Sequence, residues 1–224
     1  MTRALGIKVA LAVLFLVPIV GYGITQLPGA TSVRSGPAKP PEAIRKILQG
    51  APRVLKSFAL LDQDGKTFGP EAFAGRWTFV LLGFTHCADV CPFTLDNLAR
   101  VRDAMRGTMD ADALPGVLFL SVDPKRDSLD TLKAYAANFD PSFKAATAPK
   151  ERLDPFVAQI GAFYRYVDDH GGDHYHVRHS AEVYVIDPRV RVFAILHPPL
   201  DPADTVTRFR ALTAHYTSLE GRSM

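Results

Sequence analysis

Two cysteines, Cys87 and Cys91, are the residues of this sequence best suited to chemistry. They are four positions apart in the segment 85–92 (THCADVCP). If the segment forms a helical turn, residues i and i+4 lie side by side, so both sulfurs can reach one atom or each other. A thiolate is the species that attacks disulfides and the species that binds soft metals. The pair therefore predicts either a redox-active dithiol or a soft-metal site for an ion such as Cu(I).

The position of Pro92 indicates where the following helix begins. Proline suits the first helical turn, which places Cys91 at a helix N-terminus, where the macrodipole favours thiolate over thiol. A passive disulfide is disfavoured, because closing so short a loop adds little stability in the chain-entropy view. The extra residue relative to a Cys-x-x-Cys motif favours metal binding over redox exchange, but the spacing leaves both open.

Histidines gather later in the chain. Residues 168–180 (DDHGGDHYHVRHS) contain His170, His174, His176 and His179, and we interpret the first three as part of a solvated polar loop. His179 differs, because the predicted strand 180–187 follows it at once and fixes it at the edge of the sheet. Two thiolates and one imidazole form a set that suits copper in both oxidation states.

The surrounding pattern predicts an α/β fold. Residues 77–84 and 117–122 are near-continuous apolar runs, typical of strands buried on both faces. The other predicted elements are strand–turn–strand segments at 58–68 and 183–195 and helices with apolar positions spanning 95–105, 129–139, 153–163 and 206–216. Strands that alternate with helices and close on a hairpin indicate a sheet of mixed direction. The cysteine segment directly follows strand 77–84, at the strand end where open α/β sheets gather ligands.

Composition limits the class of protein. A chain of 224 residues with 47% hydrophobic and 22% charged residues fits one compact domain with extensions, not a disordered chain, and two cysteines exclude a disulfide-stapled scaffold. The formal net charge is +3, but residues 1–50 carry six Lys/Arg and one Glu. Residues 51–224 are therefore slightly acidic and have no general attraction for phosphate backbones, so we expect no nucleic-acid partner.

The N-terminus predicts a membrane anchor. Nineteen residues without a charge, 9–27, follow Arg3 and Lys8, and as a helix they would span roughly 28 Å, close to a bilayer core of about 30 Å. A cleaved signal peptide is the alternative, but its apolar core is usually shorter. The positive-inside rule keeps Arg3 and Lys8 in the cytoplasm. We expect a single-pass protein of the inner (cytoplasmic) membrane whose C-terminal domain faces the periplasm.

These observations divide the chain into four parts. We expect an anchor at 1–27, a flexible linker rich in Pro, Gly, Ala and Ser at 28–51, a folded domain at 52–217 and a tail at 218–224.

Three motifs in this order resemble the Sco/SenC family: GFTHCADVCP at 83–92, FLSVDPKRD at 119–127, and His179-Ser180 ahead of VYVIDP at 183–188. The resemblance covers about residues 52–217. It implies a thioredoxin-like fold, with a mixed central sheet flanked by helices, an N-terminal β-hairpin extension and one preceding transmembrane helix. It also implies that Cys87, Cys91 and His179 are ligands of Cu(I) and Cu(II).

The resemblance further implies a function. Family members are membrane-anchored copper chaperones, so we expect delivery of copper to the binuclear copper centre of cytochrome c oxidase. The expected partners are the oxidase's copper-binding subunit and other periplasmic copper chaperones. The alternative is a thiol-disulfide oxidoreductase in which Cys87 and Cys91 form the redox pair and reduce that subunit's cysteines. A peroxiredoxin-like peroxidase is least favoured, because the Thr85–Cys87 spacing is one residue too short.

The chain departs from the family pattern at two positions. Ala88 stands where the family usually has proline, and Arg178 stands where it usually has aspartate before the histidine. Asp127 matches the family's pattern, yet it is equally suited to cap the helix that begins near Ser128. We therefore leave Asp127 out of the predicted site.

Overall fold

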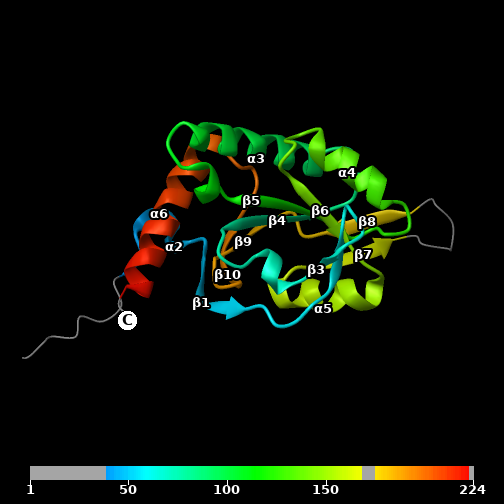
Figure 1. The fold of residues 1–224 in the computed structure, drawn as a ribbon, viewed down its shortest axis with the longest axis horizontal. Helices are drawn as coiled ribbons and strands as arrows, with labels where there is room; N and C mark the ends of the chain where they lie inside the picture. The colour runs from blue at the N-terminus through cyan, green and yellow to red at the C-terminus, as the bar shows by residue number, and fades with distance from the viewer. Residues whose placement is uncertain (1–38, 168–174, 222–224) are drawn as a thin grey trace, which may run out of the picture. The chain divides into compact units, whose positions relative to one another are not determined.

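The computed structural model describes residues 39–167 and 175–221 (Figure 1). Its main sheet has eight strands in the order β1-β10-β9-β4-β5-β6-β2-β3. In chain order the strands are β1 (Leu48–Val54), β2 (Leu60–Asp62), β3 (Thr67–Phe68), β4 (Thr78–Gly83), β5 (Gly116–Ser121), β6 (Lys144–Thr147), β9 (Val183–Ile186) and β10 (Arg191–Leu196). Strands β4, β5 and β6 are parallel, and the remaining pairs are antiparallel. The sheet is therefore mixed, as predicted.

Helices cover both faces of this sheet. They are α2 (Glu42–Arg45), α3 (Val90–Arg106), α4 (Leu129–Ala137), α5 (Lys150–Ile160) and α6 (Pro202–Glu220). Side chains alternate along β4, so Phe79 and Leu81 pack with the apolar faces of α3, α4 and α6, whereas Val80 and Leu82 pack with α5. Figure 1 shows α3 and α4 on one side of the sheet and α5 on the other. Both faces of β4 and β5 are buried, which explains their unbroken apolar sequences.

The predicted linker differs from the structure over its second half. Residues 42–51 form α2 and the start of β1, and the side chains of Ile44 and Ile47 are buried in the core. Strand β1 pairs with β10 and so extends the main sheet. Two apolar residues at helical spacing within a Pro- and Lys-rich stretch are a weak pattern, and pairing with a distant strand is not visible in the local sequence. The predicted tail also begins too early, because α6 runs to Glu220.

The third long helix ends earlier than predicted. Gly161 adopts a left-handed conformation, with φ of 78°, and terminates α5 after Ile160. The side chain of Phe163, which the apolar periodicity placed on the buried helical face, is 60% exposed.

A second, two-stranded sheet was not predicted. Strands β7 (Tyr164–Val167) and β8 (His176–His179) pair antiparallel, with Tyr164 opposite His179 and Arg165 opposite Arg178. We call this pair of strands the ribbon. His179 therefore ends a strand of the ribbon instead of marking the edge of the main sheet.

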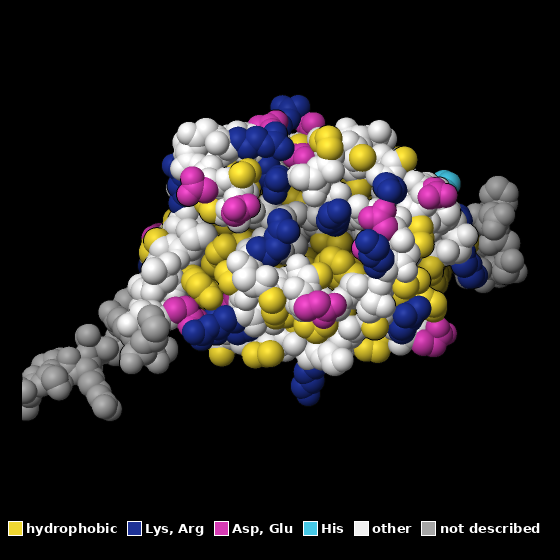
Figure 2. Space-filling model, viewed as in Figure 1, with side chains coloured by type: hydrophobic (Ala, Val, Ile, Leu, Met, Phe, Trp, Pro, Cys, Tyr) yellow, Lys and Arg dark blue, Asp and Glu magenta, His cyan; other side chains and the backbone are white. Residues whose placement is uncertain are grey.

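The described residues leave the membrane prediction untested. No helix among them is both long enough and apolar enough to cross a bilayer, and the predicted anchor at 9–27 lies outside the described residues. On the face shown in Figure 2, basic and acidic side chains are interspersed instead of gathered by sign.

Candidate metal centre

The cysteine segment joins β4 to α3. The strand ends at Gly83 and the helix begins at Val90, so Cys91 is the second residue of the helix and Pro92 the third, as the sequence predicts. Cys91 is completely buried among core residues, whereas Cys87 is partly exposed in the loop before the helix.

Gly83 allows the strand to approach the cysteine helix closely. A β-carbon at this position would lie 2.5 Å from the ring of Phe119 and 2.8 Å from Cys91 Sγ. Both distances are well inside van der Waals contact, so a side chain here would displace the ring, the sulfur or the strand. The absence of a β-carbon at Gly83 therefore lets the buried thiol occupy its place without displacing its neighbours.

Three possible ligand atoms converge beside this loop. One atom each from Cys87, Cys91 and His179 lies within 4.8 Å of the others. Cys91 Sγ and His179 Nε2 are 3.6 Å apart, and the two thiols are not bonded to each other. The structure thus brings together all three residues that the sequence predicted as ligands, from the cysteine loop, α3 and β8.

The imidazole of His179 has a fixed orientation. Its Nδ1–H donates a hydrogen bond of 2.8 Å to the carbonyl oxygen of Ser180, and this leaves the Nε2 lone pair directed at the cysteines. The ring also makes an edge contact with Phe84, with centroids 5.9 Å apart. Binding a metal through Nε2 while Nδ1–H is held by a carbonyl is a common arrangement for histidine ligands.

The two thiols differ in acidity, and the difference reverses the expectation from helix position. A hydrogen bond from the Cys91 thiol lowers the pKa of Cys87 to about 3, with smaller contributions from backbone groups. The pKa of Cys91 is raised, because its proton is shared with the Cys87 thiolate and because the group is buried. Burial beside a second sulfur outweighs the helix macrodipole. At neutral pH the pair therefore carries one negative charge, centred on Cys87.

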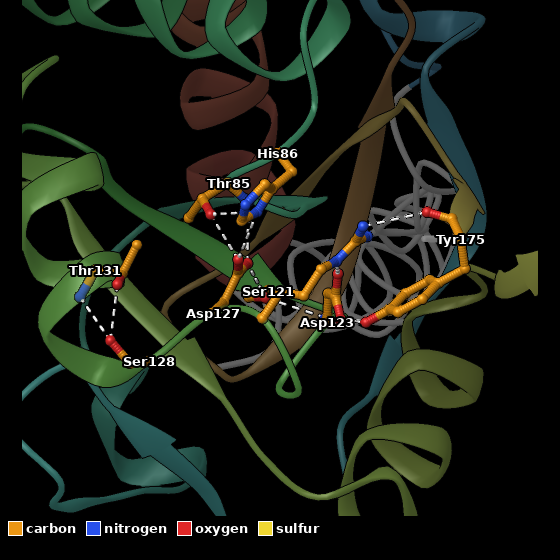
Figure 3. Close-up of polar contacts among 9 residues, drawn as sticks. Thr85, His86, Ser121, Asp123, Asp127, Ser128, Thr131 and Tyr175 are labelled. Atoms are coloured by element: carbon orange, nitrogen blue, oxygen red, sulfur yellow. Dashed lines mark hydrogen bonds and ion pairs between the residues drawn. The ribbon is translucent and has the colours of Figure 1, made fainter. Parts of the chain in front are cut away.

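Asp127 holds the start of the cysteine loop. Its buried carboxylate accepts hydrogen bonds from the backbone N–H of Thr85 at 3.0 Å, from the Thr85 hydroxyl at 2.6 Å and from the Ser121 hydroxyl at 2.6 Å, and His86 Nδ1 lies 3.7 Å away. Figure 3 shows this cluster. The helix cap is Ser128, whose side chain accepts from the Thr131 N–H. Asp127 is therefore a support of the cysteine loop and not the helix cap.

A second buried aspartate holds the ribbon. The carboxylate of Asp123 accepts a hydrogen bond from the Tyr175 hydroxyl (Figure 3). It also forms an ion pair with Arg126, whose Nε lies 2.5 Å from a carboxylate oxygen. Arg126 in turn donates to the Tyr175 carbonyl at 3.2 Å, and its guanidinium lies 3.9 Å from the centroid of the Tyr175 ring. We call Asp123, Arg126 and Tyr175 the clamp. It ties the loop after β5 to the residue just before β8, the strand that carries His179.

Among the described residues, His176 of the cluster does not join the three ligand atoms. His176 is exposed on the ribbon opposite Val167, while His170 and His174 lie outside the described residues. The clamp was not predicted from the sequence. Asp123 and Arg126 lie in the motif at 119–127, but nothing local links them to a tyrosine 49 residues beyond Arg126.

Comparisons with known proteins agree with this arrangement. The profile of the SCO1/SenC family matches residues 47–214. A SCO2-like protein of Rickettsia prowazekii (strain Madrid E) is 30% identical over 158 residues, which cover 70% of this chain and 76% of the relative. A mitochondrial SCO1 homolog of Arabidopsis thaliana is 31% identical over 159 residues, covering 71% of this chain and 44% of that protein.

Solved structures show the same fold. Yeast Sco1 with copper bound superimposes with a TM-score of 0.68 at 26% identity and covers 77% of this chain and 94% of its own. Arabidopsis thaliana ScoI with copper bound gives 0.65 at 26% identity, covering 72% and 98%. The thioredoxin-like α/β fold with a mixed central sheet is thereby confirmed. With a family profile that spans the cysteine loop, the clamp and His179, this chain belongs to the SCO1/SenC family.

Proposed function

We propose that this protein is a membrane-anchored copper metallochaperone that binds Cu(I) and Cu(II) through Cys87, Cys91 and His179. The observation that carries the proposal is the convergence of two free thiols and one imidazole nitrogen within 4.8 Å. Soft thiolates favour Cu(I), and the imidazole extends the set to Cu(II). The copper-bound yeast and Arabidopsis relatives support the same choice of metal.

The site is open on one side, which suits a cargo that must leave again. Cys87 and His179 line a hollow of about 1060 Å³, whereas Cys91 lies buried behind them. An incoming ligand from a recipient can therefore replace His179 or Cys87 first while Cys91 still holds the ion. Copper can pass in this way by ligand exchange without being released into water.

The proposed recipient is the binuclear copper centre of cytochrome c oxidase, in the oxidase's copper-binding subunit, and other periplasmic copper chaperones are the proposed donors. The sequence resemblance supports this assignment. The apolar segment 9–27 supports an anchor in the inner membrane with the copper domain in the periplasm. A C-terminal reporter that is active only after export should be active, and a shortened soluble species in the periplasm would contradict the anchor.

A copper titration of the reduced full-length protein tests the metal site. One Cu(I) should bind with high affinity against a competing chelator, and one Cu(II) should bind with intense thiolate-to-copper absorption. His179→Ala should weaken Cu(II) more than Cu(I), since two thiolates satisfy the softer ion. His176→Ala is the matched control on the same strand and should leave both unchanged. An unaltered Cu(II) spectrum in His179→Ala would remove the imidazole from the site.

Thiol-disulfide reduction is a second candidate, favoured by the acidity of Cys87. Its thiolate can attack a disulfide, form a mixed disulfide and release one thiolate of the substrate. Cys91 then gives up its proton and attacks Cys87 Sγ, which releases the second substrate thiol and leaves a Cys87–Cys91 disulfide for an external dithiol to reduce. This route needs no imidazole ligand. Full oxidase activity of His179→Ala cells at limiting copper would favour reduction over delivery.

A further inference from the structure

Exposed apolar side chains gather around the metal centre. In the described part of the chain, the exposed large hydrophobic residues are Val54, Val90, Phe93 and Phe163. Val90 and Phe163 line the hollow in front of Cys87. Phe93 follows Val90 by three positions on α3, so the two lie on one helical face. Apolar groups clustered in this way at the mouth of a site are typical of a surface that contacts another molecule.

The ribbon adds two positive charges to the same hollow. Arg165 and Arg178 stand directly opposite each other on β7 and β8, both are exposed, and both line the hollow. Neither makes an ion pair with another described residue. Like charges at directly opposed positions destabilise an antiparallel pair, so a negatively charged partner would relieve this repulsion. Asp89 is the carboxylate among the residues that line the hollow.

We propose that Val90, Phe93, Phe163, Arg165 and Arg178 form a docking surface for a partner protein whose contact segment combines acidic and apolar side chains. We call these five residues the docking rim. The inference rests on the proposed function, because the partner would bring its own copper ligands to Cys87 and His179. An apolar centre with a charged edge is the usual anatomy of a protein interface.

Charge and shape together select this kind of occupant. A small inorganic anion would use the arginines but leave the phenylalanine and valine side chains in water. A purely apolar segment would leave the two guanidinium groups facing each other. Acidic groups placed over Arg165 and Arg178 would also steer the approach of the partner and fix its register, which matters for a complex that forms only to exchange one ion.

Binding of a labelled peptide to the copper-loaded full-length protein tests the proposal. The probe is a short fluorescein-labelled peptide of alternating Asp and Leu, with an Asn/Leu twin and a Lys/Leu twin as controls, followed by fluorescence anisotropy. The acidic peptide should bind and both twins should not. The double variant Arg165→Glu/Arg178→Glu should weaken binding by about tenfold or more, and added salt should do the same.

Matched variants distinguish binding at the docking rim from nonspecific effects of net charge and of exposed apolar side chains. Lys56→Glu/Lys66→Glu makes the same change in net charge at exposed positions that do not line the hollow, and it should leave binding unchanged. Phe163→Ser should weaken binding severalfold, whereas Val54→Ser, at the remaining exposed apolar position, should not. Equal losses in the two charge-reversal variants, or equal binding of the acidic and Asn peptides, would overturn the proposal.

Measuring the copper content of each variant distinguishes a failure of the docking proposal from a failure of the proposed function. The arginine variants should load copper to the same stoichiometry as the unaltered protein. If the unaltered protein fails to bind copper, the proposed function fails. If copper binds normally and reversal of both arginines leaves the peptide's affinity unchanged, the docking rim alone is wrong.

Discussion

The metal centre joins two regions that are supported in different ways. Cys87 lies in the loop after a fully buried strand, β4, and Cys91 lies in the first turn of the helix α3 that packs on this strand. His179 lies at the end of a separate two-stranded ribbon. The thiols are thus held by the main core, whereas the imidazole is placed by contacts between the ribbon and the core, which include the clamp and the packing of Val177.

This difference has a consequence for how the site holds an ion. A buried sulfur packed against Gly83 and Phe119 cannot move without disturbing the core. The ribbon is two strands wide, and Val177 is the one residue of its strands that is buried in the core, whereas every residue of β4 is buried. We infer that the cysteines fix where copper sits and that the ribbon sets whether the imidazole joins them.

The largest expected effect is the loss of copper binding when one of the two cysteines held by the core is replaced. Cys91→Ser and Cys87→Ser should each abolish stoichiometric binding of both Cu(I) and Cu(II), because a hydroxyl is a poor ligand for soft copper. The measurement is metal content after dialysis against a weak chelator. Retention of one tightly bound Cu(I) by either variant would show that the site does not need both sulfurs.

Filling the space beside Cys91 tests how rigidly the core holds the thiol. Gly83→Ala should destabilise the protein by about 1–3 kcal/mol, because the new methyl group meets the Phe119 ring and Cys91 Sγ. Gly107→Ala is the control, since a β-carbon there meets no atom within 4 Å. Chemical denaturation of both variants gives the free energies of unfolding. Equal stability of the two would mean that the core yields easily around the sulfur.

Paired substitutions compare the two supports directly. Asp127→Asn should cost about 1–3 kcal/mol, because an amide cannot satisfy all three donors that the carboxylate now accepts, and it should weaken Cu(I) and Cu(II) together by loosening the cysteine loop. Asp130→Asn, at an exposed position on α4, should change stability by no more than about 0.5 kcal/mol.

Weakening the clamp that holds the ribbon should affect Cu(II) binding more than Cu(I) binding. Tyr175→Phe removes the hydroxyl that donates to Asp123 and should cost about 1 kcal/mol. Its mark should be a shift or loss of the Cu(II) absorption band with Cu(I) affinity nearly unchanged, since only the imidazole is displaced. Tyr164→Phe, which removes a ribbon hydroxyl bonded to exposed Asp154, should leave the band in place. Equal loss of both copper forms in Tyr175→Phe would contradict separate supports.

The same contrast explains what the sequence predicted. The core side is local: an apolar strand, two cysteines and a proline that begins a helix are contiguous, and β4, α3 and the place of Cys91 agree with the structure. The ribbon side is only partly local. Strand β7 pairs with the next strand of the chain, β8, but the bond from Tyr175 to Asp123 joins residues 52 positions apart, and no periodicity reveals it. His179 was found through the resemblance, not through its strand.

The sequence predicted the more acidic thiol at Cys91, and the structure places it at Cys87. The helix N-terminus favours a thiolate at Cys91, but this sulfur is buried and its neighbour is not. In a pair that shares one proton, the negative charge settles on the member nearer to solvent, so the better nucleophile is Cys87. Burial is a tertiary property, and the order of the two pKa values follows from it.

The smallest expected effect concerns the rate at which Cys87 is alkylated, which should hardly change with pH. Because the pKa of Cys87 is lowered to about 3, its thiolate is already formed throughout the range from about pH 5 to 8, and raising the pH there creates no further nucleophile. In the unaltered, metal-free protein, the rate of Cys87 alkylation by iodoacetamide should therefore be nearly constant across this range. An ordinary thiol would instead react about tenfold faster with each added pH unit below its pKa.

Substitution of the proton donor supplies the control for this prediction. In Cys91→Ala the hydrogen bond that contributes most to the low pKa of Cys87 is gone, so the alkylation rate should again rise with pH. A rate that climbs steeply with pH in the unaltered protein would show that the two sulfurs do not share a proton. The reductase route would then lose its activated nucleophile, while copper binding, which needs both sulfurs deprotonated in any case, would still stand.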